Sequence, residues 1–229
     1  MKTLGLIGGM SWESTQTYYQ LLNTQVKQRL GGLNSAKLVL YSVNFAEIEK
    51  LQREGEWKQA AKILSRAALS LQTAGAEAIV ICTNTMHKVA EDIEQVISIP
   101  LLHIADATAK ALKQDNIDKV ALLGTAFTME QDFYKQRLID RAISVIVPDE
   151  QQRKQIHKII YDELCQGKIL PESRQIYLDI IADLQSRGAQ GVILGCTEIG
   201  LLVNSEHTIV PLFDTTLIHA SFAVEWSLT

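Results

Sequence analysis

Two segments of this 229-residue chain nearly repeat one another and fix where its strands should end. Residues 75–83 and 188–197 each begin with Gly, continue through a short apolar run and finish in Cys-Thr. A helix-ending glycine followed by such a run is typical of a buried parallel strand. Because open α/β sheets bind ligands beyond the carboxyl ends of their strands, we predict that Cys82 and Cys196 both face a crevice.

Short apolar runs alternate with longer segments of helical period along the whole chain. Strands are expected at 3–8, 37–43, 78–82, 120–124, 144–147 and 191–195. Helices are expected at 13–30, 57–74, 85–96, 106–113, 130–141, 150–166, 171–187 and 214–228. This alternation predicts an α/β fold with parallel sheets built from right-handed crossover units.

The repeat extends beyond the cysteines, which indicates an internal duplication. Residues 2–8, 11–13 and Tyr19 have counterparts at 119–124, 128–130 and Tyr134. We therefore expect two similar parallel-sheet α/β lobes related by pseudo-twofold symmetry. The first would span 1–114, with Cys82 and with the C-terminal helix 212–229 packed on it, and the second 115–211, with Cys196. A single six-stranded sheet with the thiols far apart is the alternative.

Charge and hydropathy exclude several classes of partner. The chain has 22 basic and 26 acidic residues, a net charge of −4 and no cluster of Lys or Arg, so neither a nucleic-acid nor a membrane partner is expected. No apolar run approaches the ~20 residues of a bilayer helix, and Met1-Lys2 leads directly into a strand. We expect a cytoplasmic protein whose three cysteines are free thiols.

Two thiols at strand ends can perform a reaction that one cannot. We expect a helix that opens near Met86, after Thr83-Asn84-Thr85, and a short helix after Thr197-Glu198. Their N-termini would favour the thiolates. If a substrate carbon lay between the sulfurs of Cys82 and Cys196, one could remove its proton while the other protonated the opposite face. Either cysteine alone is more typical of a small buried residue, and it is the repeated strand-end context that favours a functional pair. Cys165, inside an amphipathic helix, is assigned to packing.

Polar groups beside the thiols suit an anionic ligand. Thr83, Asn84, Thr85 and Thr197 offer donors for a carboxylate, although ordinary helix capping is the competing interpretation. Glu198 is either a proton relay or a solvated helix-start acid. Lys168 is either a clamp for a distal carboxylate or a solvated loop lysine.

Two further features bear on cofactors. The loop Gly8-Gly9-Met10-Ser11, matched by Gly124-Thr125 in the second half, fits a close-approach loop lining a small pocket, and the chain lacks both nucleotide-binding glycine motifs. The five histidines show no metal-ligand spacing with each other or with the cysteines, so no metal is expected. His87 lies five residues after Cys82 and is either a group that activates this thiol or a structural residue, and its position further along a helix favours the structural role.

Several of these motifs, in order, resemble the aspartate/glutamate racemase family over essentially the full length. They are Leu6-Ile7-Gly8-Gly9-Met10-Ser11, Cys82-Thr83-Asn84-Thr85-Met86-His87, Leu123-Gly124-Thr125 with Thr128-Met129, and Gly195-Cys196-Thr197-Glu198. The two motifs that contain Cys82 and Cys196 are most similar to those of the bacterial broad-specificity amino-acid racemases.

The resemblance implies a cofactor-independent racemase, often a homodimer, with its active site in the cleft between two α/β domains. It implies that Cys82 and Cys196 are the catalytic acid/base pair. Residues around the substrate's carboxylate and ammonium would be Met10, Thr83, Asn84, Thr85, Thr125 and Thr197, and Lys168 would contact a side-chain carboxylate. The arginine expected in aspartate-specific members is missing from residues 45–49, and Arg53 comes only later.

The sequence therefore predicts an enzyme that interconverts L and D forms of aspartate, glutamate or a small polar amino acid. Two alternatives stay open. One is a relative acting on another small carboxylate, of the hydantoin racemase, maleate isomerase or decarboxylase type. The other is a two-lobed amino-acid-binding protein or one that uses a Cys82–Cys196 disulfide as a redox sensor.

Overall fold

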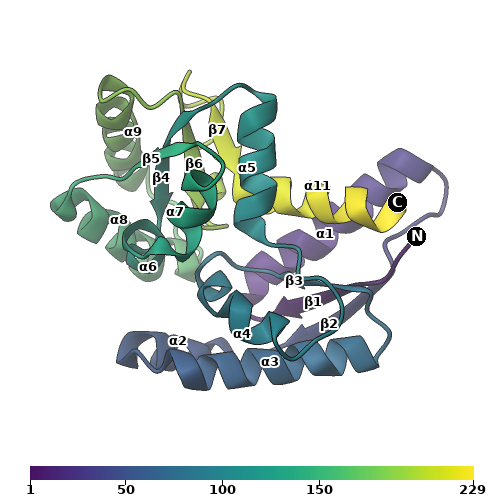
Figure 1. The fold of residues 1–229 in the computed structure, drawn as a ribbon. Coiled ribbons are helices and arrows are strands. Elements are labelled where there is room, and N and C mark those ends of the chain that lie inside the picture. The colour runs from purple at the N-terminus through teal and green to yellow at the C-terminus, as the bar shows by residue number, and fades with distance from the viewer. The chain divides into compact units, whose positions relative to one another are not determined.

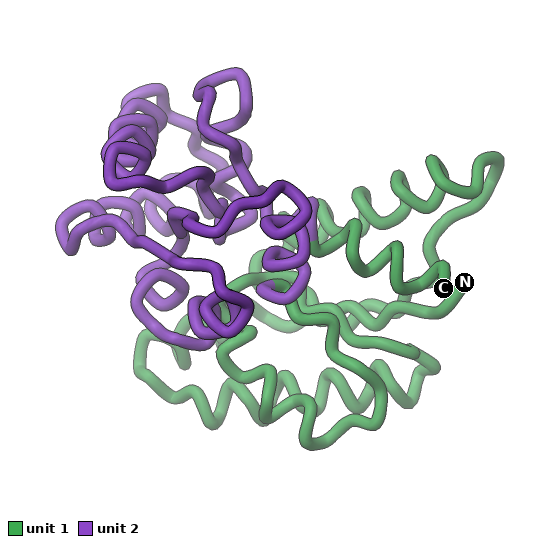
Figure 2. The backbone as a smooth tube through the Cα atoms, turned by 45° about the horizontal axis from the view of Figure 1, so that its top comes forward, with its two compact units in different colours: residues 1–104, 219–229 green, residues 105–218 purple.

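A computed structural model describes residues 1–229 and contains two parallel sheets, with strand orders β2-β1-β3 and β5-β4-β6-β7. Two sheets confirm the two-lobed α/β fold, and the single six-stranded sheet is wrong. Figure 2 shows the two compact units, unit 1 with residues 1–104 and 219–229 and unit 2 with residues 105–218. Residues 105–114 and 212–218, which we expected with the first lobe, are grouped with unit 2.

Unit 1 is a three-layer arrangement around β1. The connection from β1 to β2 and the connection from β2 back past β1 to β3 cross the sheet in opposite directions. Crossovers of one hand that run in opposite directions place their helices on opposite faces of the sheet, as Figure 1 shows. The elements are β1 (Leu4–Gly8), α1 (Trp12–Leu30), β2 (Leu38–Ser42), α2 (Phe45–Glu54), α3 (Trp57–Thr73), β3 (Ala78–Ile81), η1 (Thr85–Val89), α4 (Ala90–Glu94) and, from residue 219 on, α11 (Thr215–Leu228).

Alternate residues of the strands supply two apolar clusters. One, here called the α1-side cluster, joins the β1 and β3 residues Leu6 and Val80 to Tyr18 of α1 and Ala223 of α11. The other, the α3-side cluster, packs the opposite strand residues against α3 and includes Met10. Because side chains alternate along a strand, each sheet residue belongs to one face only.

Unit 2 repeats the strand order of unit 1, since β5-β4-β6 corresponds to β2-β1-β3. Its elements are α5 (Ile104–Gln114), β4 (Lys119–Gly124), α6 (Ala126–Glu130), α7 (Asp132–Ile139), β5 (Ser144–Ile146), α8 (Glu150–Asp162), η2 (Leu164–Gln166), α9 (Pro171–Ser186), β6 (Gly191–Gly195), α10 (Ile199–Leu202) and β7 (Leu212–Asp214). Leu123 and Leu194 pack against α8 and α9 in the core of this unit.

The duplication extends to details that the sequence comparison did not reach. In unit 1 the Ile79 N–H donates to the Pro100 carbonyl at 2.8 Å, and in unit 2 the Val192 N–H donates to Pro211 at 2.8 Å. Tyr18 and Tyr134 are both fully buried, and their hydroxyls lie 2.8 Å from His219 Nδ1 and 2.9 Å from Thr108 Oγ1. Tyr19, the expected counterpart of Tyr134, is 56% exposed, so Tyr18 is the true counterpart and the expected match is off by one residue.

Three elements were not expected, α2, α6 and β7. Helix α2 buries only Ile48 and Gln52, so its apolar stripe is too short to reveal a helical period. The clearest sequence signal for this helix is its N-cap residue Asn44, whose side chain accepts from the Ala46 N–H. Strand β7 has three residues, too few for a period to be recognised. None of the helices combines the length and the hydropathy needed to cross a membrane.

Candidate functional site

The strand registers show which residues of the two Cys-Thr corners correspond. In unit 2, Gly124 at the end of β4 pairs with Gly195, and Cys196 follows. In unit 1 the pairing of Ile7 with Ile81 brings Gly8, the counterpart of Gly124, level with Cys82. Cys82 therefore corresponds to Gly195, and Thr83 corresponds to Cys196. The expected equivalence of the two cysteines is off by one residue.

Cys82 lies in the apolar core of unit 1 and not at a surface. Its side chain is fully buried in the α1-side cluster, and its carbonyl accepts from the Ser14 hydroxyl at 2.8 Å. Burial raises the pKa of the Cys82 thiol. The expected crevice-facing sulfur and the expected helix-stabilised thiolate are both wrong for this residue, because desolvation outweighs the dipole of a helix as short as η1.

Thr83 is partly exposed, and the two residues after it are buried. Asn84 directly precedes η1, and Thr85 is its first residue. The Thr83 carbonyl lies 2.8 Å from Nδ1 of His87. The chain thus turns at the end of β3 so that Thr83 is the most exposed residue of the corner.

The β1–α1 loop lies at the same edge of the sheet, because β1 and β3 are parallel neighbours. The Gly9 N–H donates to Thr15 Oγ1 at 2.8 Å. Gly9 has φ = 87°, and a Cβ there would lie 2.2 Å from the Val43 carbonyl oxygen, so only glycine fits. This confirms a close-approach loop. Met10 is buried in the α3-side cluster, with 4% of its surface exposed.

Cys196 is half-buried at the end of β6, and its sulfur donates to Glu198 Oε2 at 3.0 Å. Burial, followed by the negative charge of Glu198, raises the pKa of the thiol well above its usual value. The expected lowering of this pKa is therefore wrong as well. Glu198 is buried, so it is not a solvated acid, and it is placed to accept the thiol proton.

Three other predicted residues also lie in unit 2. Thr125 Oγ1 accepts from the Thr128 N–H at 3.4 Å, so it caps α6. Thr197 is partly exposed beside Cys196. Lys168 is exposed and donates to Gln166 Oε1 at 2.8 Å.

The loop that carries Lys168 is anchored near the end of β6. Arg174, in the first turn of α9, donates through Nε to the Leu202 carbonyl of α10 at 2.8 Å. Helix α10 begins three residues after Cys196. Two segments distant in sequence, α9 and the strand end with the thiol, are therefore joined at the carboxyl edge of this sheet.

Sequence reasoning missed Tyr177, a fully buried residue of α9. Burial raises its pKa well above the usual value, and the charges of Cys196, Glu163 and Cys165 add to this effect. Helical period predicts only that position 177 is buried, and nothing in the sequence relates it to Cys196. Cys165 packs against the core of unit 2, as expected.

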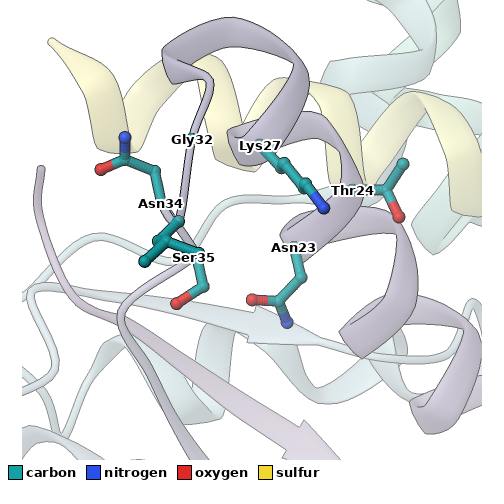
Figure 3. Close-up of a pocket in the computed structure, with 7 residues that line it drawn as sticks. Asn23, Thr24, Lys27, Gly32, Asn34 and Ser35 are labelled. Atoms are coloured by element: carbon teal, nitrogen blue, oxygen red, sulfur yellow. The ribbon is translucent and has the colours of Figure 1, made fainter.

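An open pocket of about 320 Å³ lies elsewhere in unit 1. Figure 3 shows its lining at the end of α1 and in the loop that follows, formed by Asn23, Thr24, Lys27, Gly32, Leu33, Asn34 and Ser35. Helix α1 starts at the carboxyl end of β1 and runs back along the sheet, so the pocket lies at the opposite edge from Thr83. It is not part of the candidate site. No group of three or more His, Cys, Asp and Glu side chains could hold a metal ion.

The duplicated sheets, with polar residues directly after β3 and β6, define a class of two-unit α/β proteins whose ligand sites typically lie at strand ends. A model of the Asp/Glu/hydantoin racemase family matches residues 7–223, and this chain belongs to that family.

Relatives support the assignment over the whole length. The broad specificity amino-acid racemase RacX of Bacillus subtilis (strain 168) is 22% identical over 227 residues, covering 96% of each chain. A solved structure from Yersinia pestis, provisionally described as an Asp/Glu racemase, is 59% identical with a TM-score of 0.94 and covers 100% of both chains. An aspartate racemase homologue from Pyrococcus horikoshii OT3 is 35% identical with a TM-score of 0.88, again over 100% of both chains.

Proposed function

We propose that this protein is an amino-acid racemase that interconverts the L and D forms of an acidic or small polar amino acid without a cofactor. The observation that carries the proposal is the Cys196–Glu198 pair at the end of β6, with a sulfur-to-oxygen distance of 3.0 Å, in a member of a racemase family. A carboxylate within hydrogen-bonding distance of a thiol can accept its proton, and the resulting thiolate is a base that can remove a proton from a substrate carbon.

The proposed reaction transfers one proton at each face of the α-carbon. Glu198 accepts the proton of the Cys196 thiol, and the thiolate then removes the α-proton and becomes a thiol again. The electron pair of the broken C–H bond is held by the substrate carboxylate as an enolate. An acid on the opposite face donates a proton to that carbon, so the configuration inverts. Glu198 then holds one proton more and the opposite acid one fewer, and proton exchange with water returns both groups to their starting states.

The second acid is proposed to come from the Cys82–Thr83 corner of unit 1, and two residues there are candidates. The family resemblance favours Cys82, which is fully buried in an apolar cluster. The strand register favours Thr83, because it occupies the position that Cys196 has in unit 2 and is partly exposed. We propose Thr83. A hydroxyl is a weaker acid than a thiol and needs a neighbouring group to help it transfer a proton.

The substrate is proposed to bind through its α-carboxylate to donors around Asn84, Thr85, Thr125 and Thr197. Lys168 would reach a side-chain carboxylate, which favours aspartate or glutamate. Arg53 does not supply this charge, since it is exposed and pairs with Glu49 at 3.4 Å. With one flexible cation and no arginine clamp, neutral polar amino acids fit the proposal too.

The test is a panel of single enantiomers followed by chiral chromatography, with wild-type protein and with Cys196→Ala. We expect the opposite enantiomer to form with the wild type and to be lost in the variant. Cys165→Ala is the matched control, because it removes the other half-buried thiol of unit 2 and should keep the activity. Racemisation at the wild-type rate by Cys196→Ala would contradict the proposal.

The same panel separates the alternatives. A decarboxylase or isomerase of the wider family changes the mass or the constitution of its substrate, whereas a racemase changes neither. An amino-acid-binding or redox-sensing protein would bind without turnover. The expected homodimer stays a prediction, and sedimentation of the purified protein would test it.

A further inference from the structure

We propose that His87 is a positioning residue that holds the Thr83-Asn84-Thr85 corner of unit 1 in its functional shape. The inference rests on the proposed function, because that corner is where the second acid and the carboxylate donors are expected. It assigns a role to a buried histidine that the proton transfers themselves do not use.

The turn after Thr83 is a 3₁₀ helix, η1, and not an α-helix. The His87 N–H donates to the Asn84 carbonyl, three residues back, at 3.1 Å. In an α-helix the same N–H would bind the carbonyl four residues back, which is that of Thr83. The η1 geometry therefore frees the Thr83 carbonyl for another donor.

The ring of His87 supplies that donor. Its Nδ1 lies 2.8 Å from the Thr83 carbonyl oxygen, and its Nε2 accepts from the Ile104 N–H at 3.2 Å. A carbonyl accepts and an N–H donates, so the two contacts together require a neutral imidazole with its proton on Nδ1. One side chain thus fixes both the tighter helix and the direction of the Thr83 peptide.

The surroundings hold this ring in place. His87 is 2% exposed, and its centroid lies 4.5 Å from that of His103 and 5.6 Å from that of His219. His219 is itself fixed, because Nε2 lies 2.6 Å from the Leu102 carbonyl and Nδ1 lies 2.8 Å from the Tyr18 hydroxyl. The ring nitrogens of His219 bond to Leu102 and Tyr18 and not to the Thr83 corner, so His219 is a matched control within the same buried group.

The consequence for the site follows from the lost bond. Without the Nδ1 donor, the nearest replacement donor for the Thr83 carbonyl is the backbone N–H of residue 87. A hydrogen bond between these two groups would convert η1 into an α-turn. That conversion reorients the peptides between Thr83 and Thr85. Misplacement of reacting groups by about 1 Å can cost a hundredfold in rate.

The test compares two amides at position 87. Asn places a donor near the position of Nδ1, whereas Gln places its amide near that of Nε2. We expect His87→Asn to keep kcat within about threefold of the wild type and His87→Gln to lower kcat by about ten- to a hundredfold. Both lose one of the two ring contacts, so their melting temperatures should fall by similar amounts.

A readout independent of turnover keeps this inference separate from the proposed function. Amide hydrogen exchange over residues 83–89 should be near wild-type in His87→Asn and faster in His87→Gln, while His219→Gln should leave that segment protected. If the wild type racemises no amino acid, the proposed function fails, but the comparison of hydrogen exchange still tests the positioning role of His87. Equal exchange and equal kcat in the two variants would overturn the inference.

Discussion

Replacing Cys82 with Ala separates the two candidates for the second acid. The sulfur is fully buried among apolar side chains of the α1-side cluster, so its removal leaves a small cavity. A buried atom of this size contributes about 1–2 kcal/mol to stability. In a chain of this length the loss corresponds to a fall of roughly 2–8 °C in melting temperature. The register argument predicts that the racemisation rate of Cys82→Ala at 25 °C stays near the wild-type value.

Thr83→Ala should behave in the opposite way. Thr83 is partly exposed, so the variant should melt within about 2 °C of the wild type. Loss of an acid that takes part in proton transfer lowers kcat by about 10²–10⁴-fold. The assay is differential scanning calorimetry together with chiral chromatography on the same samples. An inactive Cys82→Ala beside a fully active Thr83→Ala would refute the register argument and restore Cys82 as the catalytic group.

Three further predictions address the chemistry and the fold. Glu198→Gln should lower kcat by about a hundredfold, since the proton acceptor of Cys196 is lost; it should also lower the pKa of the thiol, seen as faster alkylation at a given pH, and an unchanged alkylation profile would contradict this. Burial lowers the pKa of His219 to about 4 from 6.5, so the unfolded chain binds more protons between these values. The free energy of unfolding should therefore fall by about 2 kcal/mol between pH 7.5 and pH 5 because of His219. Urea unfolding of His219→Gln should lack this decrease. The same pH dependence in the wild type and the variant would contradict the prediction. Gly9→Ala should lose at least about 2 kcal/mol, because its Cβ would meet the Val43 carbonyl, and wild-type urea stability would disprove the close approach.

The fold was largely predictable from period and duplication. The strands at 3–8 and 191–195 were expected within one residue of their observed bounds, because buried parallel strands are continuous apolar runs. Helix 85–96 was expected as one element, but it is divided into η1 and α4. Sequence period does not distinguish a 3₁₀ turn from an α-turn over five residues, and the side-chain bond from His87 that favours the tighter turn is a tertiary detail.

The candidate site was harder to predict, and Cys82 shows why. Matching Cys-Thr with Cys-Thr maximises sequence identity, whereas strand pairing is set by the backbone register. A shift of one residue moves a side chain to the other face of a strand, from a ligand edge into a core. The same limit applies to the thiol pKa values, because sequence reveals a nearby helix start but not the desolvation that outweighs it.

The central claim is that two different groups act on opposite faces of one α-carbon. Racemisation of a single enantiomer in deuterium oxide, followed at early times by chiral separation and mass spectrometry, tests it most directly. A thiol that removes a proton carries that same proton back if the enolate returns, so the account predicts deuterium at the α-carbon of the product and none in the unreacted substrate. Deuterium appearing equally in both enantiomers from the start, or no inverted product from any amino acid, would contradict the account.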